Sequence, residues 1–173
     1  MAPLAGSQPD QSLNPDQSLN DVAERGDRTL RIASLLDGYS VDQQAGFLLR
    51  RAHQRHAAIF LDGMAPADLT PTQFTALVKT VEAGRITQNH LGRLAAMDPA
   101  TIQGVVRRLV ERGLLLRTQD PADRRAVVLE PTGAGLALAR SAVASARRIT
   151  EATLAPLDAA ERRQFLSLLR KLV

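Results

Sequence analysis

Apolar residues recur at helical spacing along most of the chain, and this pattern predicts a mainly helical fold. A short amphipathic piece begins at Leu30 and stops at Gly38, and a longer helix follows over about residues 42–62. Further helical patterns begin after Thr70, Thr87, Asp98, Thr132 and Asp158. Residues 1–27 are polar and contain the direct repeat 9–14 and 15–20, so we expect a disordered tail there.

Capping signals divide the middle of the chain into three helices. Thr70–Pro71 is a cap followed by proline at the first helical position, and that helix ends at Gly84. Thr87 caps a short helix with Leu91, Leu94 and Ala95 facing inward, and Asp98–Pro99 opens the next. Two short helices joined by a tight turn are typical of a helix-turn-helix.

Two strand-like runs follow the second of these helices. Residues 114–117 and 126–129 are strand-like and enclose a charged turn, which predicts a β-hairpin. The turn carries Arg124 and Arg125, and arginine gains from the negative potential of a narrow minor groove. Asp120 and Asp123 are expected to orient these arginines and support the turn. The segment therefore reads as a winged helix-turn-helix.

The helix after Asp98 has one apolar and one polar face. Its core stripe is predicted to consist of Ile102, Val105, Val106, Leu109 and Val110. The outer face offers candidate DNA contacts. Gly104 has no side chain, so the helix backbone can come close to the floor of a DNA groove at this position. The candidates, with two from the preceding helix, are Gln88, Asn89, Thr101, Gln103, Gly104, Arg107 and Arg108. An ordinary solvated helix face is the alternative interpretation.

The terminal helices are too apolar to project alone from a small winged domain. Burial against a second copy would cover them and set two recognition helices about one DNA turn apart. We therefore expect dimerisation helices over 28–62 and 132–173, and a DNA-binding lobe over 70–131, within one domain over 28–173.

Composition narrows the function further. The chain has 173 residues, a formal net charge of +4 and no cysteine, which excludes disulfides and thiolate chemistry. Its cations are almost all arginine, the residue that pairs bidentately with phosphate and guanine. Neither a signal-peptide pattern nor a long apolar run is present, so a cytoplasmic protein without membrane contact is expected. No phosphate loop, nucleophile elbow or paired carboxylates support an enzyme, which is kept as a remote alternative.

Across about residues 40–172 the chain resembles the MarR family of bacterial transcription regulators. The resemblance rests on three segments. Residues 70–74 resemble the start of the family's second helix, and residues 98–102 through to 112–114 resemble its recognition helix with the exit into the wing. The wing motif at residues 120–125 is the most specific of the three. One departure is Ala122, where many members carry arginine, which assigns minor-groove insertion to Arg124. The resemblance implies a mainly α winged helix-turn-helix homodimer that binds a pseudo-palindromic operator in double-stranded DNA as a repressor released by a small molecule.

The resemblance also implies an effector site. Members that sense hydroxylated aromatic acids carry an Arg-Arg pair followed by histidine, and residues 50–56 look similar. Arg50 would then pair with a carboxylate, His53 and His56 would lie along the same strip, and Phe47, Phe60 and Phe74 would form apolar walls. A hydroxybenzoate or hydroxypyridine carboxylate fits best, and control of catabolic or efflux genes is expected. Solvated cations, or a zinc-responsive site at His53 and His56, are the alternatives; neither a metal nor another cofactor is expected.

Overall fold

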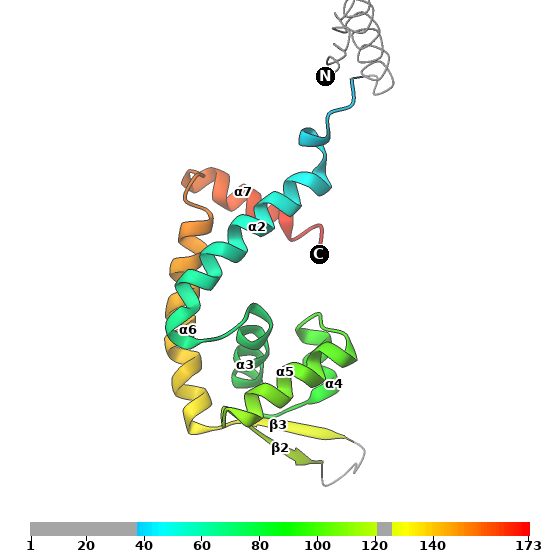
Figure 1. The fold of residues 1–173 in the computed structure, drawn as a ribbon, viewed down its shortest axis with the longest axis vertical. Helices are drawn as coiled ribbons and strands as arrows, with labels where there is room; N and C mark the ends of the chain where they lie inside the picture. Colours follow the sequence, from blue (N-terminus) through cyan, green and yellow to red (C-terminus); the bar gives the residue numbers. More distant parts are fainter. Residues whose placement is uncertain (1–37, 121–125) are drawn as a thin grey trace, which may run out of the picture. The chain divides into compact units, whose positions relative to one another are not determined.

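The computed structural model describes residues 38–120 and 126–173 (Figure 1). The chain divides into two compact units, residues 1–49 and 50–173. The described part of the first unit contains the 3-10 helix η1 (Val41–Gln43) and the beginning of helix α2 (Ala45–Met64). Gln44 has an extended backbone, φ −77° and ψ 135°, so α2 begins three residues later than the sequence pattern indicated at Asp42.

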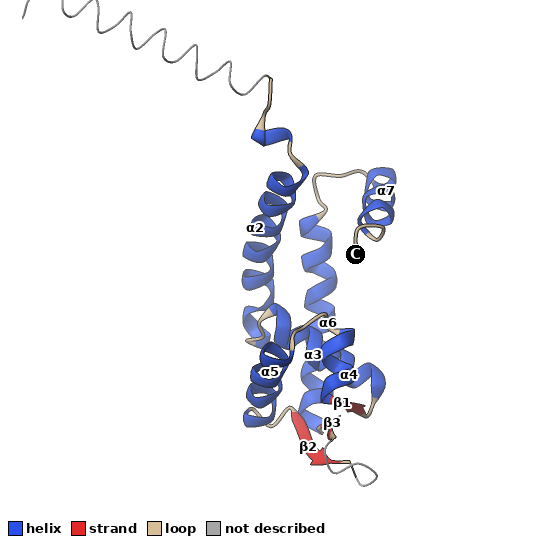
Figure 2. Cartoon of the chain, turned by 90° about the vertical axis from the view of Figure 1, so that its right-hand side faces the viewer, coloured by secondary structure: helices blue, strands red, loops and turns tan. Residues whose placement is uncertain are grey.

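The second unit holds the winged helix-turn-helix that the sequence predicted. After α2 and the 3-10 helix η2 (Ala65–Ala67) come α3 (Pro71–Ala83), β1 (Ile86–Thr87), α4 (Gln88–Leu94) and α5 (Pro99–Glu111). The hairpin strands β2 (Leu115–Gln119) and β3 (Val127–Pro131) precede α6 (Gly133–Thr153) and α7 (Ala159–Leu169). Figure 2 shows the helices and strands of this mainly α fold by type.

The caps inferred from sequence form the expected bonds. Thr70 and Gln73 make a reciprocal capping box at the start of α3, and Asp158 and Glu161 make another at the start of α7. Thr87 Oγ1 accepts from the His90 N–H, and Thr132 Oγ1 accepts from the Gly135 N–H. Each cap satisfies N–H groups that would otherwise have no partner in the first helical turn.

A third strand was not predicted. The sheet order is β1-β3-β2 with antiparallel pairing, and Ile86 pairs with Leu129 while Arg117 pairs with the same residue from the other side. A strand of two residues is too short to show an alternation of apolar and polar side chains, so the sequence gives no signal for it. The strand is defined only by its pairing with the edge of β3. The sheet closes the wing side of the lobe.

The core lies where α3, α5 and the sheet meet. Leu77, Leu91, Leu109 and Leu129 are fully buried, and Met64 at the end of α2 is 1% exposed. Leu94 was expected to face inward, but it is 50% exposed, because the seven residues of α4 bury Leu91 and Gly92 instead. The helix α3 packs against both α5 and α6, so it joins the DNA-binding lobe to the long C-terminal helix.

Apolar side chains remain exposed on the last helix and beyond it. Phe165 is 40% exposed, Leu168 52% and Leu172 73%. These side chains belong to the apolar C-terminal segment that the sequence predicts to be covered by a second copy, and in the single chain they are exposed. No helix within 38–120 and 126–173 is long and apolar enough to cross a membrane.

Candidate DNA-binding surface and ligand pocket

The helix α5 is anchored at its N-terminus by Asp98. One carboxylate oxygen, Oδ1, accepts from the backbone N–H groups of Ala100 at 3.0 Å and Thr101 at 2.9 Å. The other oxygen accepts from the Thr101 hydroxyl. The pKa of Asp98 is lowered, first by the Thr101 side chain and then by the backbone N–H groups that bond the charged form. The cap therefore holds the first turn of α5 in a fixed geometry at neutral pH.

The inner and outer faces of α5 divide as the sequence predicted. Ile102, Val105, Val106 and Leu109 are buried and Val110 is half-buried. Among the candidate contacts on the other face, Thr101, Gln103, Arg107 and Arg108 are exposed and Gly104 is half-exposed. This surface is continuous along two turns of the helix and is available to an external partner.

Two of these side chains have internal partners. The Thr101 hydroxyl is used in the Asp98 cap, so its oxygen lone pairs rather than its proton remain for an external contact. Arg107 Nε lies 3.7 Å from Glu111 Oε1, with both side chains mostly exposed. An exposed pair of this kind contributes at most about 1 kcal/mol, so Arg107 can exchange it for a phosphate.

Gln88 and Asn89 form the first turn of α4. Gln88 is half-buried and Asn89 is exposed. The Thr87 cap bonds the backbone of His90 rather than either of these side chains. The side-chain amides of both residues therefore lie at the start of α4, where the helix dipole favours contact with anions such as phosphate.

The wing is fixed at its base by an arginine that sequence reasoning missed. The Asp120 N–H donates to Ala126 O at 2.9 Å and closes the hairpin next to the turn. Arg85 lies 3.7 Å from the Asp120 carboxylate and 3.4 Å from Glu130. Asp120 thus pairs with the turn between α3 and β1. Asp123, Arg124 and Arg125, the other residues predicted for the wing, lie outside the described residues.

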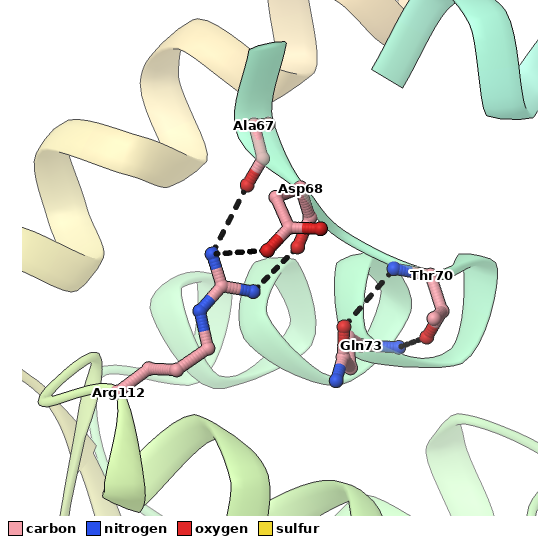
Figure 3. Close-up of polar contacts among 5 residues, drawn as sticks. All are labelled: Ala67, Asp68, Thr70, Gln73 and Arg112. Carbon is pink, nitrogen blue, oxygen red and sulfur yellow. Dashed lines mark hydrogen bonds and ion pairs between the residues drawn. The ribbon is translucent and has the colours of Figure 1, made fainter. Parts of the chain in front are cut away.

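The C-terminal end of α5 is tied to the corner between α2 and α3 (Figure 3). Arg112 donates through Nη1 to Asp68 O at 2.5 Å and through Nη2 to Ala67 O at 3.2 Å. Asp68 adopts a left-handed backbone, φ 48° and ψ 50°, which turns its carbonyl toward the guanidinium. No sequence pattern signals this contact, because its partners are 44 and 45 residues apart.

Three of the predicted ligand-site residues come together in one cavity. His56, Phe60 and Phe74 line a volume of about 220 Å³, closed by residues of α3 and α6 that include Thr75 and Thr150. The ring centroids of Phe60 and Phe74 are 6.1 Å apart in an edge arrangement, and those of His56 and Phe60 are 6.2 Å apart. The cavity combines aromatic walls with a few polar groups, as small-molecule pockets do.

Polar groups at this cavity are held by bonds to α6 and, for Thr75, to α3. His56 Nδ1 lies 3.0 Å from Thr153 Oγ1. The neighbouring Arg55 donates to the carbonyl oxygens of Thr153 and Ala152 at the end of the same helix. The hydroxyls of Thr75 and Thr150 donate to backbone carbonyls four residues earlier, at 2.9 Å and 3.0 Å. Their lone pairs therefore remain as acceptors for a ligand donor.

The remaining predicted ligand residues do not join this cavity in the described part of the chain. Arg50 and His53 lie on α2 but are absent from its lining, and both are exposed. They lie six and three residues before His56, about 9 Å and 4.5 Å farther toward the N-terminal end of α2, beyond the residues that line the cavity. Phe47 belongs to the first unit. Among the described residues no cluster of three histidine or acidic side chains could hold a metal ion.

Comparison with known proteins agrees with this architecture. The model of the MarR family matches residues 69–127. A repressor of Pseudomonas putida, the HTH-type transcriptional repressor NicR, is 42% identical over 135 residues, which cover 78% of this chain and 85% of NicR.

Two solved structures are similar over the same share of the chain. A probable transcriptional regulator from Pseudomonas aeruginosa has a TM-score of 0.75 and 47% identity, covering 78% of this chain and all of that one. BpsR of Bordetella bronchiseptica, whose DNA binding is regulated by 6-hydroxynicotinic acid, has a TM-score of 0.74 and 41% identity, covering 78% and 96%. With its winged helix-turn-helix in place, this chain belongs to the MarR family and is a transcriptional repressor of that non-enzymatic, DNA-binding class.

Proposed function

We propose that the chain acts as a homodimeric repressor that a small aromatic carboxylic acid releases from a pseudo-palindromic operator. The observation that carries this proposal is the meeting of His56, Phe60 and Phe74 around one cavity between α2, α3 and α6. The effector belongs to the hydroxybenzoate or hydroxypyridine carboxylate type. The genes under its control would be catabolic or efflux genes.

The cavity suits a molecule with a single ring. Its volume of about 220 Å³ lies below the roughly 300–1,000 Å³ typical of pockets for drug-sized ligands. Phe60 and Phe74 offer ring faces and edges, while Thr75 and Thr150 offer acceptors for a ring hydroxyl. His56 can bond a ring hydroxyl or nitrogen. The regulation of BpsR by a hydroxypyridine carboxylate supports this chemistry.

Arg50 is the proposed partner of the effector carboxylate. Since it does not line the cavity of the single chain, its contact requires an arrangement in which the effector or the dimer brings it closer. Effector binding then stabilises one spacing of the two recognition helices over another, which is the only way that a ligand can shift the DNA-binding equilibrium. The dimer would be formed by residues 28–62 and 132–173.

The DNA contacts are proposed on α5, the start of α4 and the wing. Gln103 is placed to bond a base edge, Arg107 and Arg108 to bond phosphates or guanine, and Arg124 with Arg125 to enter the neighbouring minor groove. Removal of one bidentate base contact costs about 1–3 kcal/mol. A Gln103→Ala variant should therefore lose affinity for the operator and discriminate less at one base pair.

Variant proteins separate the two parts of this proposal. Binding to the DNA upstream of the gene is measured by fluorescence anisotropy, with 6-hydroxynicotinate and 4-hydroxybenzoate as probes. An Arg124→Ala, Arg125→Ala double variant should bind the duplex more weakly, while Arg163→Ala on α7, an exposed arginine, should bind as wild type does. Duplex affinity unchanged by the wing variant would overturn the wing assignment.

The effector part has its own variants. His56→Ala and Arg50→Gln should keep duplex binding but need more acid for release. Release at the wild-type concentration of acid in both variants would show that the pocket lies elsewhere.

A further inference from the structure

A second cavity opens between α3 and α6, one helical turn away from the first. Its volume is about 490 Å³, which lies in the range of small-molecule pockets. Val78 and Val81 of α3 face Ala139 and Val143 of α6 across it. None of the residues that line this groove lines the His56 cavity.

Two arginines stand at the rim of this apolar groove. Arg140 and Arg147 are seven residues apart on α6, which places them about 10.5 Å apart along the same side of the helix. Both are exposed, and neither has an ion pair or a hydrogen bond within 38–120 and 126–173. Arg148 differs, since its guanidinium donates to Ser145 Oγ at 3.0 Å.

The one acidic residue of the lining does not neutralise them. Glu82 Oε2 lies 2.8 Å from Lys79 Nζ, one turn away on α3. The groove therefore combines an apolar floor with two positive charges that have no intramolecular counterpart among the described residues. An arginine guanidinium binds a carboxylate through two parallel N–H···O bonds.

We propose that this groove is a second binding site, for a small amphipathic carboxylate whose apolar or aromatic body lies on the valine floor and whose carboxylate pairs with Arg140 or Arg147. The site is separate from the His56 pocket and does not depend on it. Its occupant touches α3, which packs against α5, so binding here also acts on the DNA-binding lobe. Together with the proposed His56 site, the groove makes two acid-binding sites per chain, and the count of two rests on that proposed function.

The test uses the full chain and a probe whose charge can be removed. Isothermal titration calorimetry measures the binding of 4-hydroxybenzoate and of its neutral analogue 4-hydroxybenzamide. Two events per chain are expected for the acid. An Arg140→Gln, Arg147→Gln double variant should lose one event or weaken it by about tenfold for each charge-assisted pair removed. The amide should bind this site as weakly in wild type as the acid does in the double variant.

Further variants assign each event to its cavity. Ala144 is exposed and lines the groove, so Ala144→Phe fills it from the surface without disturbing the core. This variant should abolish the same event and keep the wild-type circular dichroism spectrum. Phe74→Leu in the other cavity should alter only the second event, and the control Arg163→Gln should alter neither. Wild-type stoichiometry and affinity in both groove variants would overturn the proposal, as would equal affinity of the groove for the amide.

A second copy of the chain is the competing occupant of the groove. Sedimentation of the Arg140→Gln, Arg147→Gln variant decides this, because the proposal predicts the wild-type oligomeric state. A shift toward smaller species would contradict it and identify the groove as an interface between chains.

Discussion

Removing the guanidinium of Arg112 should destabilise the chain without changing its core. An Arg112→Met substitution keeps most of the unbranched stem and deletes both hydrogen bonds to the corner between α2 and α3 (Figure 3). This corner contains the buried residues Ala67 and Leu69. Without the guanidinium, the backbone carbonyls of Ala67 and Asp68 lose their hydrogen-bond donor, and α5 loses its polar link to the α2–α3 corner.

The magnitude follows from the type and exposure of the contacts. Hydrogen bonds to charged groups contribute about 1.5–3 kcal/mol each when they are shielded from water. The Arg112 side chain is 32% exposed, and water can reach at least one of the two carbonyls after the substitution. We therefore expect a loss of about 2 kcal/mol for the pair of bonds. The ion pair with Asp68, at 3.9 Å and with Asp68 96% exposed, should contribute well under about 1 kcal/mol.

A control variant that removes the Asp68 charge but keeps the side-chain shape separates the carbonyl bonds from the ion pair. Asp68→Asn keeps the backbone acceptor, and asparagine tolerates the left-handed φ of 48° at this position. Its free energy of unfolding should change by less than about 0.5 kcal/mol. Urea denaturation at matched protein concentration measures both variants, since a dimer would make stability depend on concentration. Equal destabilisation by Asp68→Asn and Arg112→Met would refute the reasoning and assign the contact to charge pairing.

Two further predictions concern helix starts. Gly135→Ala should cost about 3 kcal/mol of unfolding free energy or prevent folding, because the added Cβ would lie 2.1 Å from Leu114 O. Gly133→Ala is the control, since a Cβ there has no neighbouring atom within 4 Å, and it should be neutral in the same denaturation assay. Asp98→Ala should lower the thermal midpoint most at neutral pH. Because the folded-state pKa of Asp98 is lowered, chiefly by the Thr101 hydroxyl, the stabilisation is present above the ordinary carboxyl pKa and is lost as pH falls through the lowered one. Midpoints measured from pH 7 into the acid range should therefore converge; a constant gap would mean that the charge of the cap is irrelevant.

Local signals explain why most elements were predictable. Thr70, Thr87 and Asp98 each precede an apolar stripe and each makes the cap bonds expected of it. A cap needs only its own side chain and the next three residues, so the sequence alone contains the information. The outer face of α5 was predictable for the same reason, since Ile102, Val105 and Val106 define the inner face by spacing.

Long-range contacts explain what the sequence left hidden. The strand β1 exists because Ile86 meets the edge of β3, and the wing base is fixed by Arg85, which no motif singles out. The residues proposed for the ligand site come together only in part. His56, Phe60 and Phe74 meet because α3 and α6 close over the end of α2, whereas Arg50 and His53 were grouped with them by spacing along one helix and lie outside the cavity. Spacing places residues on a helix, but only packing decides which of them share a pocket.

The most direct test of the account is duplex binding by the purified chain at two salt concentrations, with and without 6-hydroxynicotinate. The DNA is the segment upstream of its own gene. The account predicts binding that weakens as salt rises, because arginines displace counterions from phosphates, and release of the duplex when the acid is added. Tight binding that no aromatic acid relieves would contradict the effector site, and the absence of salt-sensitive binding to this DNA would contradict the DNA contacts proposed on α5, α4 and the wing.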